Sequence, residues 1–227
     1  MDSTPGHSWN ITLDEAKVLQ KSLAQRIKIC RLPSKIKRVA GFDVSYLKDK
    51  NMLIAGMVII DYPSLNFCDA FVITDQINFP YIPGYLSFRE APVLLKLIEK
   101  HQNLADVFIF DGHGVAHPRG LGIASHIGVL INRPSIGCAK KKLVGEYNLP
   151  DLQKGSNTDL IFRKEIVGKV MRTKHKIKPV FVSVGNLVGL GEAAQFILNC
   201  TGKYRLPEPT RLAHNTVSSY RKSILGL

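Results

Sequence analysis

The residues that this sequence has in short supply narrow its possible functions. It has four cysteines, at positions 30, 68, 138 and 200, and no two are spaced as a Cys-x-x-Cys pair. That spacing argues against a zinc knuckle, a thioredoxin-like motif and a disulfide framework. No apolar run approaches the length of a membrane span, and the first ten residues lack the features of a secretory signal. We therefore expect a monomeric cytoplasmic protein, in a reducing compartment, with no membrane partner.

Acidic residues are also scarce relative to basic ones. The chain has 31 Lys and Arg against 18 Asp and Glu, a net charge of +13. Residues 133–227 hold 17 basic and 6 acidic residues, a net of +11, which leaves 14 basic and 12 acidic residues, a net of +2, in residues 1–132. Nucleic acid is the usual partner of such a basic region. The alternative is surface charge that serves only solubility.

The hydrophobic patterning predicts an α/β protein. The 227 residues, 45% of them hydrophobic, suit a single domain over residues 1–227. Apolar periodicity and β-branched runs predict helices over 11–30, 87–102, 123–130, 192–200 and 210–224, and strands over 38–46, 53–62, 68–77, 106–111, 135–138, 166–172 and 179–184. Short polar breaks join the first three strands, as in an antiparallel meander. We expect a mixed sheet, this meander plus parallel strands, flanked by helices. Ser87 is the expected cap of the second helix, and residues 140–160 are expected to form a loop.

Two acids stand in otherwise apolar strands. Asp43 lies inside the first predicted strand, and Asp111 ends the fourth. An unpaired buried carboxylate is costly, and two neighbouring carboxylates repel each other unless a cation lies between them. Hard oxygen ligands suit Mg²⁺, and Mn²⁺ can substitute. Glu90, near the start of the second predicted helix, could reach the same place. The alternative is that each acid pairs with a lysine or arginine, or caps a turn.

Five segments resemble one nuclease family. They are residues 39–46 (VAGFDVSY), 79–90 (FPYIPGYLSFRE), 111–119 (DGHGVAHPR), 121–126 (LGIASH) and 207–211 (PEPTR). In their residues and in their order along the chain, these segments resemble the endonuclease V family, the deoxyinosine-directed repair nucleases. The resemblance implies an RNase H-like fold in which the first and fourth strands are neighbours, which would bring Asp43 to Asp111.

The resemblance also implies roles for particular residues. The metal-binding acids would be Asp43, Glu90 and Asp111, and the active-site lysine would be Lys140. His214 would stand at a fourth site position, which is histidine in some members and aspartate in others. It could position water or contact the metal from outside its ligand shell.

Two further groups of residues would handle the DNA. The family's wedge corresponds to Pro80, Tyr81, Ile82 and Pro83, whose stiff aromatic tip could fill the gap left by an unstacked base. The pocket for a flipped hypoxanthine would be lined by Gly84, Leu86, Gly112, Gly122 and Ile123. Without the resemblance, the wedge segment would be interpreted as a surface turn with Tyr81 packed on the core.

The implied activity is a Mg²⁺-dependent cut in DNA that contains deoxyinosine. The second phosphodiester bond 3′ to the lesion would be hydrolysed, leaving 3′-hydroxyl and 5′-phosphate ends. Two alternatives stay open: action on inosine in RNA, and a non-catalytic nucleic-acid-binding module. A zinc site at His113 and His117 is disfavoured, because Gly112, Gly114 and Pro118 argue against the helix that this spacing requires. A hydrogen bond of His117 within its loop is expected instead.

Overall fold

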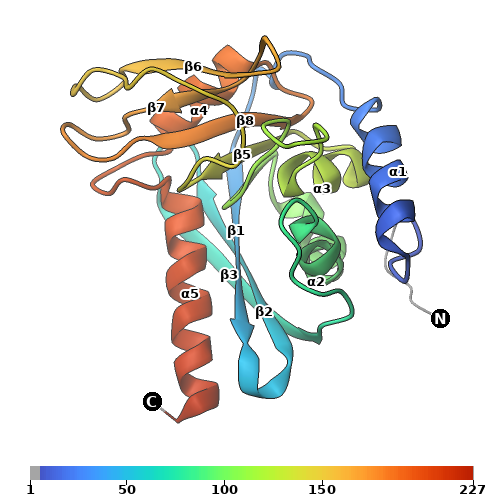
Figure 1. The fold of residues 1–227 in the computed structure, drawn as a ribbon. Coiled ribbons are helices and arrows are strands. Elements are labelled where there is room, and N and C mark those ends of the chain that lie inside the picture. Colours follow the sequence, from blue (N-terminus) through green and yellow to red (C-terminus); the bar gives the residue numbers. More distant parts are fainter. Residues whose placement is uncertain (1–5, 227) are drawn as a thin grey trace.

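The computed structural model describes residues 6–226 as one large sheet with helices on both faces (Figure 1). The strands are β1 (Arg38–Leu47), β2 (Met52–Asp61), β3 (Phe67–Gln76), β4 (Val107–Phe110), β5 (Ser135–Ala139), β6 (Asn157–Phe162), β7 (Glu165–Met171) and β8 (Val180–Asn186). The helices are α1 (Leu13–Ala24), α2 (Leu86–His101), α3 (Ile123–Ile131), α4 (Leu190–Asn199) and α5 (Glu208–Leu225), with short 3₁₀ turns at Lys48–Lys50 and Gln102–Leu104.

The eight strands are ordered β3-β2-β1-β4-β5-β8-β7-β6. The expected meander is confirmed, because β1, β2 and β3 pair antiparallel. β4 lies beside β1 and parallel to it, and β5 continues in the same direction. The last three strands differ from the expectation: β8, β7 and β6 all pair antiparallel, so the parallel set is limited to β1, β4 and β5.

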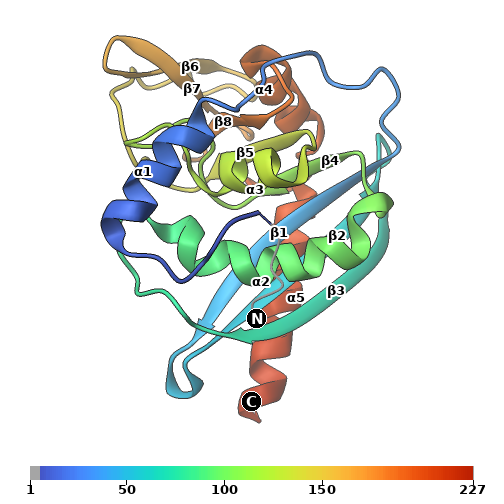
Figure 2. The ribbon, with the colours of Figure 1, turned by 90° about the vertical axis from the view of Figure 1, so that its right-hand side faces the viewer.

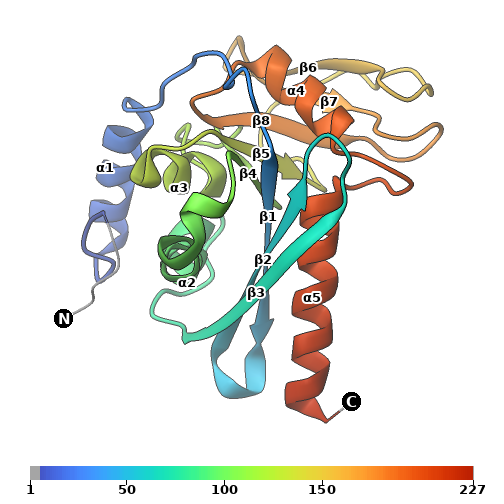
Figure 3. The ribbon, with the colours of Figure 1, turned by 180° about the vertical axis from the view of Figure 1, so that it is seen from behind.

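Alternating side chains of the central strands form two separate cores. Ala40 and Phe108 point to the face covered by α2 and α3, whereas Val39 and Ile109 point to the face covered by α4 and α5. Figures 2 and 3 show these two layers from the side and from behind, with α1 outside α3. The period of two in the strands places every second residue against each helical layer.

Helix α5 lies unusually close to the central sheet. A Cβ atom on Gly41 of β1 would come within 2.1 Å of the backbone carbon of Pro209, at the start of α5. A Cβ on Gly56 of β2 would come within 2.5 Å of the Val217 side chain. The two glycines therefore allow the helix to lie directly on the sheet, which fixes where its side chains project.

Three local predictions were wrong. Helix α1 ends at Ala24 rather than near residue 30, and β6 occupies part of a segment expected to be loop. Ser87 does not cap α2, which begins at Leu86; the buried Ser87 hydroxyl lies 2.9 Å from Nδ1 of His126 instead.

All four cysteines are free thiols. Among the helices of residues 6–226, none combines the length and apolarity needed to cross a membrane.

Candidate active site

The parallel pairing of β1 and β4 sets two carboxylates side by side. Phe42 is the register partner of Phe110, and the amide of Asp111 donates to the carbonyl oxygen of Phe42 at 3.4 Å. Asp43 and Asp111 are the residues that directly follow this pair. Their side chains are only 10% and 17% exposed. The adjacency that the family resemblance implied for these acids is therefore present in the fold.

The third acid comes from helix α2. Glu90 lies in its first turns and faces the same cavity as the two aspartates. That cavity has a volume of about 570 Å³. It is lined by Asp43, Val44, Ser45, Leu86, Glu90, Asp111, Lys140, His214, Ser218, Arg221, Lys222 and Leu225. All five residues expected to be catalytic thus line one cavity, although they come from β1, α2, α5 and the segments after β4 and β5.

Burial and mutual repulsion raise the pKa values of two of these carboxyls. Desolvation, followed by the charge of Asp111, raises the pKa of Asp43 to about 6, although His214 and Lys140 oppose the shift. Desolvation, followed by the charges of Asp43 and Asp111, raises the pKa of Glu90 to about 8. Full ionisation of the three neighbouring carboxyls is therefore unfavourable in this poorly solvated cavity, and raised carboxyl pKa values of this kind are typical of cation-binding and catalytic sites.

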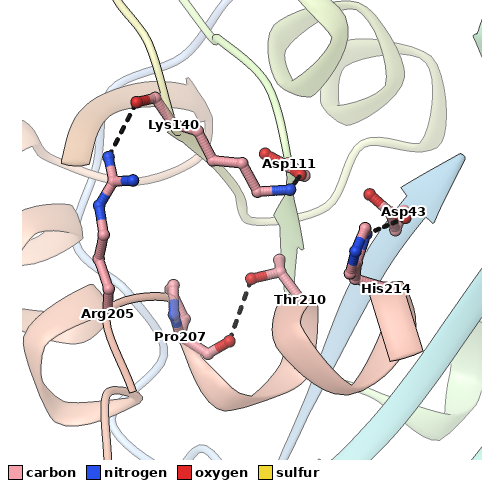
Figure 4. Close-up of polar contacts among 7 residues, drawn as sticks. All are labelled: Asp43, Asp111, Lys140, Arg205, Pro207, Thr210 and His214. Carbon is pink, nitrogen blue, oxygen red and sulfur yellow. Dashed lines mark hydrogen bonds and ion pairs between the residues drawn. The ribbon is translucent and has the colours of Figure 1, made fainter. Parts of the chain in front are cut away.

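A histidine and a lysine contact the aspartates (Figure 4). Nδ1 of His214, on α5, lies 3.0 Å from Oδ2 of Asp43. Lys140, just after β5, forms an ion pair with Asp111. The backbone of Lys140 is held by Arg205, whose guanidinium donates to the Lys140 carbonyl oxygen at 2.9 Å and to that of Pro179 at 2.7 Å. Arg205 was not singled out in the sequence, because nothing local indicates its contact with a residue 65 positions away.

The acids are not already arranged as a ligand cage. Within residues 6–226, no three His, Cys, Asp or Glu side chains are gathered closely enough to hold a metal ion. Asp111 pairs with a lysine, as in the alternative that the sequence left open, whereas Asp43 contacts His214. Glu90 has neither an ion pair nor a side-chain hydrogen bond with any described residue. Of the three carboxyl groups, it is the one whose charge no neighbouring side chain in the described residues pairs with.

A second cavity, of about 310 Å³, adjoins the first. It is lined by Tyr81, Ile82, Pro83, Gly84, Leu86, Ser87, Gly112, His113, His117, Gly122, Ile123, Lys141, Lys142 and Leu143. All five residues expected to form a base pocket are among them, together with three of the four wedge residues. Leu86 lines both cavities, so the two sites share a wall.

Close backbone packing shapes this second cavity. A Cβ on Gly122 would come within 2.2 Å of the carbonyl oxygen of His113, and one on Gly112 within 2.6 Å of the Ile123 side chain. Nε2 of His117 lies 3.0 Å from the carbonyl oxygen of Gly84, across the cavity, and its Nδ1 accepts from the Arg119 amide at 3.2 Å. His117 therefore makes the expected bond within its loop and a further bond to Gly84, the residue that follows the wedge.

The wedge segment projects into solvent. Tyr81 is 69% exposed, and Pro80 and Pro83 are exposed on either side of it. The alternative, with Tyr81 packed on the core, is therefore wrong. An exposed aromatic ring on a proline-stiffened turn, at the rim of a cavity, suits contact with a base.

The comparisons with known proteins agree with this arrangement. The family model for endonuclease V matches residues 21–215. Endonuclease V of Gloeobacter violaceus is 46% identical over 221 residues, covering 96% of this chain and 89% of the relative. The crystal structure of endonuclease V from Streptomyces avermitilis superposes with a TM-score of 0.88 at 35% identity, covering 96% of each chain. Endonuclease V from Ciona intestinalis, in complex with a 24mer DNA containing an inosine followed by a ribo-adenosine, gives 0.82 at 32% identity, covering 93% and 98%. The chain therefore belongs to the endonuclease V family, the deoxyinosine-directed DNA repair endonucleases.

Proposed function

We propose that Asp43, Glu90 and Asp111 together hold Mg²⁺, or Mn²⁺ in its place, and that phosphodiester hydrolysis takes place at this site. The observation that carries the proposal is the convergence of three carboxylates, two of them with raised pKa values, in one cavity. The donor set is all oxygen, as Mg²⁺ prefers. Asp43 and Asp111 would exchange their present partners for the metal by side-chain rotation.

The chemistry that Mg²⁺ supplies when bound is the activation of water and the offsetting of charge on the phosphate undergoing attack. Lys140 is placed to neutralise a phosphate oxygen beside Asp111, and Arg205 holds its backbone in position. His214, half-exposed, is placed between Asp43 and solvent, where its ring nitrogens can orient a water molecule. No side chain needs to act as a covalent nucleophile.

The second cavity is the proposed pocket for a flipped hypoxanthine. Gly84, Gly112 and Gly122 let a base approach the backbone closely, and the amide of Gly84 and the carbonyl oxygen of Gly112, which make no hydrogen bond to the described residues, can distinguish a base carbonyl from an amino group. Because Leu86 lines both cavities, a base held in one places the neighbouring backbone near the acids of the other. Tyr81 would fill the gap that the flipped base leaves in the helix.

The proposed reaction hydrolyses the second phosphodiester bond 3′ to deoxyinosine and leaves 3′-hydroxyl and 5′-phosphate ends. Incubation of a labelled deoxyinosine duplex with Mg²⁺ tests it, with adenosine at the same position as the control. A nick at that bond in the inosine strand alone is expected. No nick, or equal nicking of the adenosine strand, would contradict the proposal.

The RNA alternative is tested in parallel with an inosine-containing RNA of the same sequence. The Ciona intestinalis relative is bound to DNA with a ribo-adenosine directly after the inosine, so the sugar at that position is the variable to change. We propose DNA as the substrate and a cytoplasmic location for the protein, acting as a monomer. Faster cleavage of the RNA would assign the protein to RNA instead, and metal-independent binding without cleavage would support a non-catalytic module.

A further inference from the structure

The cavity that holds the acids continues along helix α5 beyond His214. Its lining includes Ser218, Arg221 and Lys222, which follow His214 by four, seven and eight residues. That spacing places all four residues on one face of the helix. We call Ser218, Arg221 and Lys222 the α5 strip. It lies past residue 215, where the match to the family model ends, so family membership assigns it no role.

The two cations of the α5 strip are available to a ligand. Arg221 and Lys222 are exposed, and among the residues that the structure describes no carboxylate lies within ion-pair distance of either. By contrast Arg211, on the same helix, is already paired with Glu208. The strip thus adds two uncompensated positive charges to a cavity whose other end holds three carboxylates.

The strip is held on a rigid support. The adjoining side of α5 packs on β1 and β2 through buried residues that include Ala213 and Val217. The close approach at Gly41 and Gly56 fixes the helix against the sheet. Figures 1 and 3 show that the C-terminal half of α5 runs alongside strands β1 and β2. Arg221 and Lys222 are therefore presented in a defined direction, which lowers the entropic cost of binding.

The order of the base cavity, the acids and the α5 strip indicates which side of the cut in the DNA strand lies over α5. The base cavity and the acids share Leu86, and the α5 strip lies at the far side of the acids. Since the proposed cut is 3′ to the lesion, a strand that enters from the base cavity and crosses the acids leaves over α5 toward its 3′ end. Seven or eight residues of helix span about 10–12 Å, or about three nucleotides of a B-form strand.

We infer that the α5 strip binds the phosphodiester backbone on the 3′ side of the cut. This inference rests on the proposed function, because the direction of the strand comes from the position of the cut. Arg221 and Lys222 bind two phosphates of the strand downstream of the scissile bond, and the Ser218 hydroxyl donates to the nearer one. These contacts are the same before and during the reaction, so they lower KM and leave kcat unchanged.

The test removes the two charges and shortens the substrate. In Arg221→Gln/Lys222→Gln, KM for a duplex that continues about ten nucleotides past the cut should rise about tenfold at about 100 mM salt, with kcat within about twofold. The slope of log affinity against log salt should decrease by about 1.5–2, the contribution of two phosphates. On a strand that ends one nucleotide past the cut, wild-type protein and variant should have the same KM.

A matched control separates the strip from general charge. Lys35→Gln/Lys37→Gln removes two exposed lysines from the segment that precedes β1. In Figure 1, β1 begins at the end of the molecule remote from the C-terminal half of α5. It should leave KM on the long duplex within about twofold of the wild-type value, because neither lysine lines the cavity. A KM for the strip variant equal to that of this control, or a defect that persists on the shortened strand, would overturn the inference.

Two further readouts keep the outcome decisive. The alternative is that the two cations stabilise only the C-terminus of helix α5. The strip variant would then unfold at a lower temperature than the wild type and bind the duplex with the same affinity. That result would overturn the inference. If wild-type protein does not nick the deoxyinosine strand, the proposed function fails. Binding of the long and short duplexes, followed by fluorescence anisotropy, then decides the strip separately through the same change in salt slope.

Discussion

His214 on α5 and Asp43 on β1 are joined by a 3.0 Å contact between Nδ1 and Oδ2, although they lie 171 positions apart in the chain. The contact ties the central strand to the helix that closes the other side of the active-site cavity. Asp43 also lies beside Asp111, the first residue after the neighbouring strand. The position of α5 on the sheet therefore determines whether His214 and Asp43 meet.

His214→Ala should lower the rate of nicking by about 10–100-fold, the usual cost of losing a group that orients a metal ligand. Binding of the inosine duplex should be unchanged, because the residue touches Asp43 rather than the base cavity. His214→Asp should restore part of the rate and require less Mg²⁺, since it adds a carboxylate beside Asp43. Single-turnover rates over a Mg²⁺ titration measure both effects, with the exposed neighbour Asn215→Ala as the control. A rate for His214→Ala equal to that of Asn215→Ala would show that the contact is dispensable.

Glu90→Gln should stabilise the metal-free protein at alkaline pH. The pKa of Glu90 is raised to about 8 in the folded state, from an ordinary value of 4.5. Between these values the folded protein binds a proton that the unfolded chain has released, so the stability of the wild type falls as pH rises through this window. The neutral glutamine removes the dependence and should raise stability at pH 8 by about 1 kcal/mol or more, or about 2–4 °C in Tm.

Thermal unfolding in EDTA at pH 5 and pH 8 measures this effect. The difference between Glu90→Gln and wild type should be large at pH 8 and small at pH 5. Added Mg²⁺ should then stabilise the wild type more than the variant, because a ligand stabilises the state that binds it. Parallel pH profiles for the two proteins would mean that Glu90 does not carry the raised pKa.

Tyr81→Ala should weaken binding to the lesion without affecting the fold. Tyr81 is 69% exposed, so its removal should change stability by less than about 0.5 kcal/mol. Loss of stacking on bases should cost about 1–3 kcal/mol of binding, or about 5- to 150-fold in affinity for the inosine duplex. Tyr220→Ala, which removes an exposed tyrosine from the side of α5 facing Phe67, is the control. If Tyr81→Ala and Tyr220→Ala bind the inosine duplex with equal affinity, Tyr81 does not act as a wedge.

Gly41→Ala should displace helix α5 from the sheet and so disturb the active-site cavity. The added Cβ would lie 2.1 Å from a backbone atom of Pro209, and backbone cannot move aside as a flexible side chain can. A loss of stability of about 1–3 kcal/mol is expected, together with a lower nicking rate as α5 and His214 shift from Asp43. Gly191→Ala on α4 has no atom within 4 Å of its Cβ and should be neutral or slightly stabilising. Chemical denaturation compares the two, and similar stabilities would contradict the close packing of α5.

The parts of the fold that the sequence predicted are those with strong local patterns. The run around Asp43 and the run that ends at Asp111 predicted two central strands, because β-branched and aromatic residues dominate both. The end of α1 was missed because its apolar pattern continues to residue 30. In the fold, Asn186 and Leu187 take the backbone hydrogen bonds of Lys28, and the helix cannot extend there.

The parts that the sequence did not predict depend on contacts between distant segments. Ser87 has the residue type and position of a cap, but its hydroxyl is used by His126 in the core. Helix α5 was expected near its observed range, yet which face would line the cavity depends on its packing against Gly41 and Gly56. The α5 strip was therefore overlooked, and Glu90 was assigned from the family segment that contains it rather than from any local feature.

The most direct test of the metal site is Asp43→Ala, assayed for both binding and cleavage of the deoxyinosine duplex. Cleavage in Mg²⁺ is expected to fall by about 10³-fold or more, because one of the three carboxylates proposed to hold the metal is lost. The affinity for the duplex is expected to stay within about threefold of the wild-type value, because the wedge, the base cavity and the basic residues are unchanged. Cleavage by Asp43→Ala at the wild-type rate would contradict the three-carboxylate metal site.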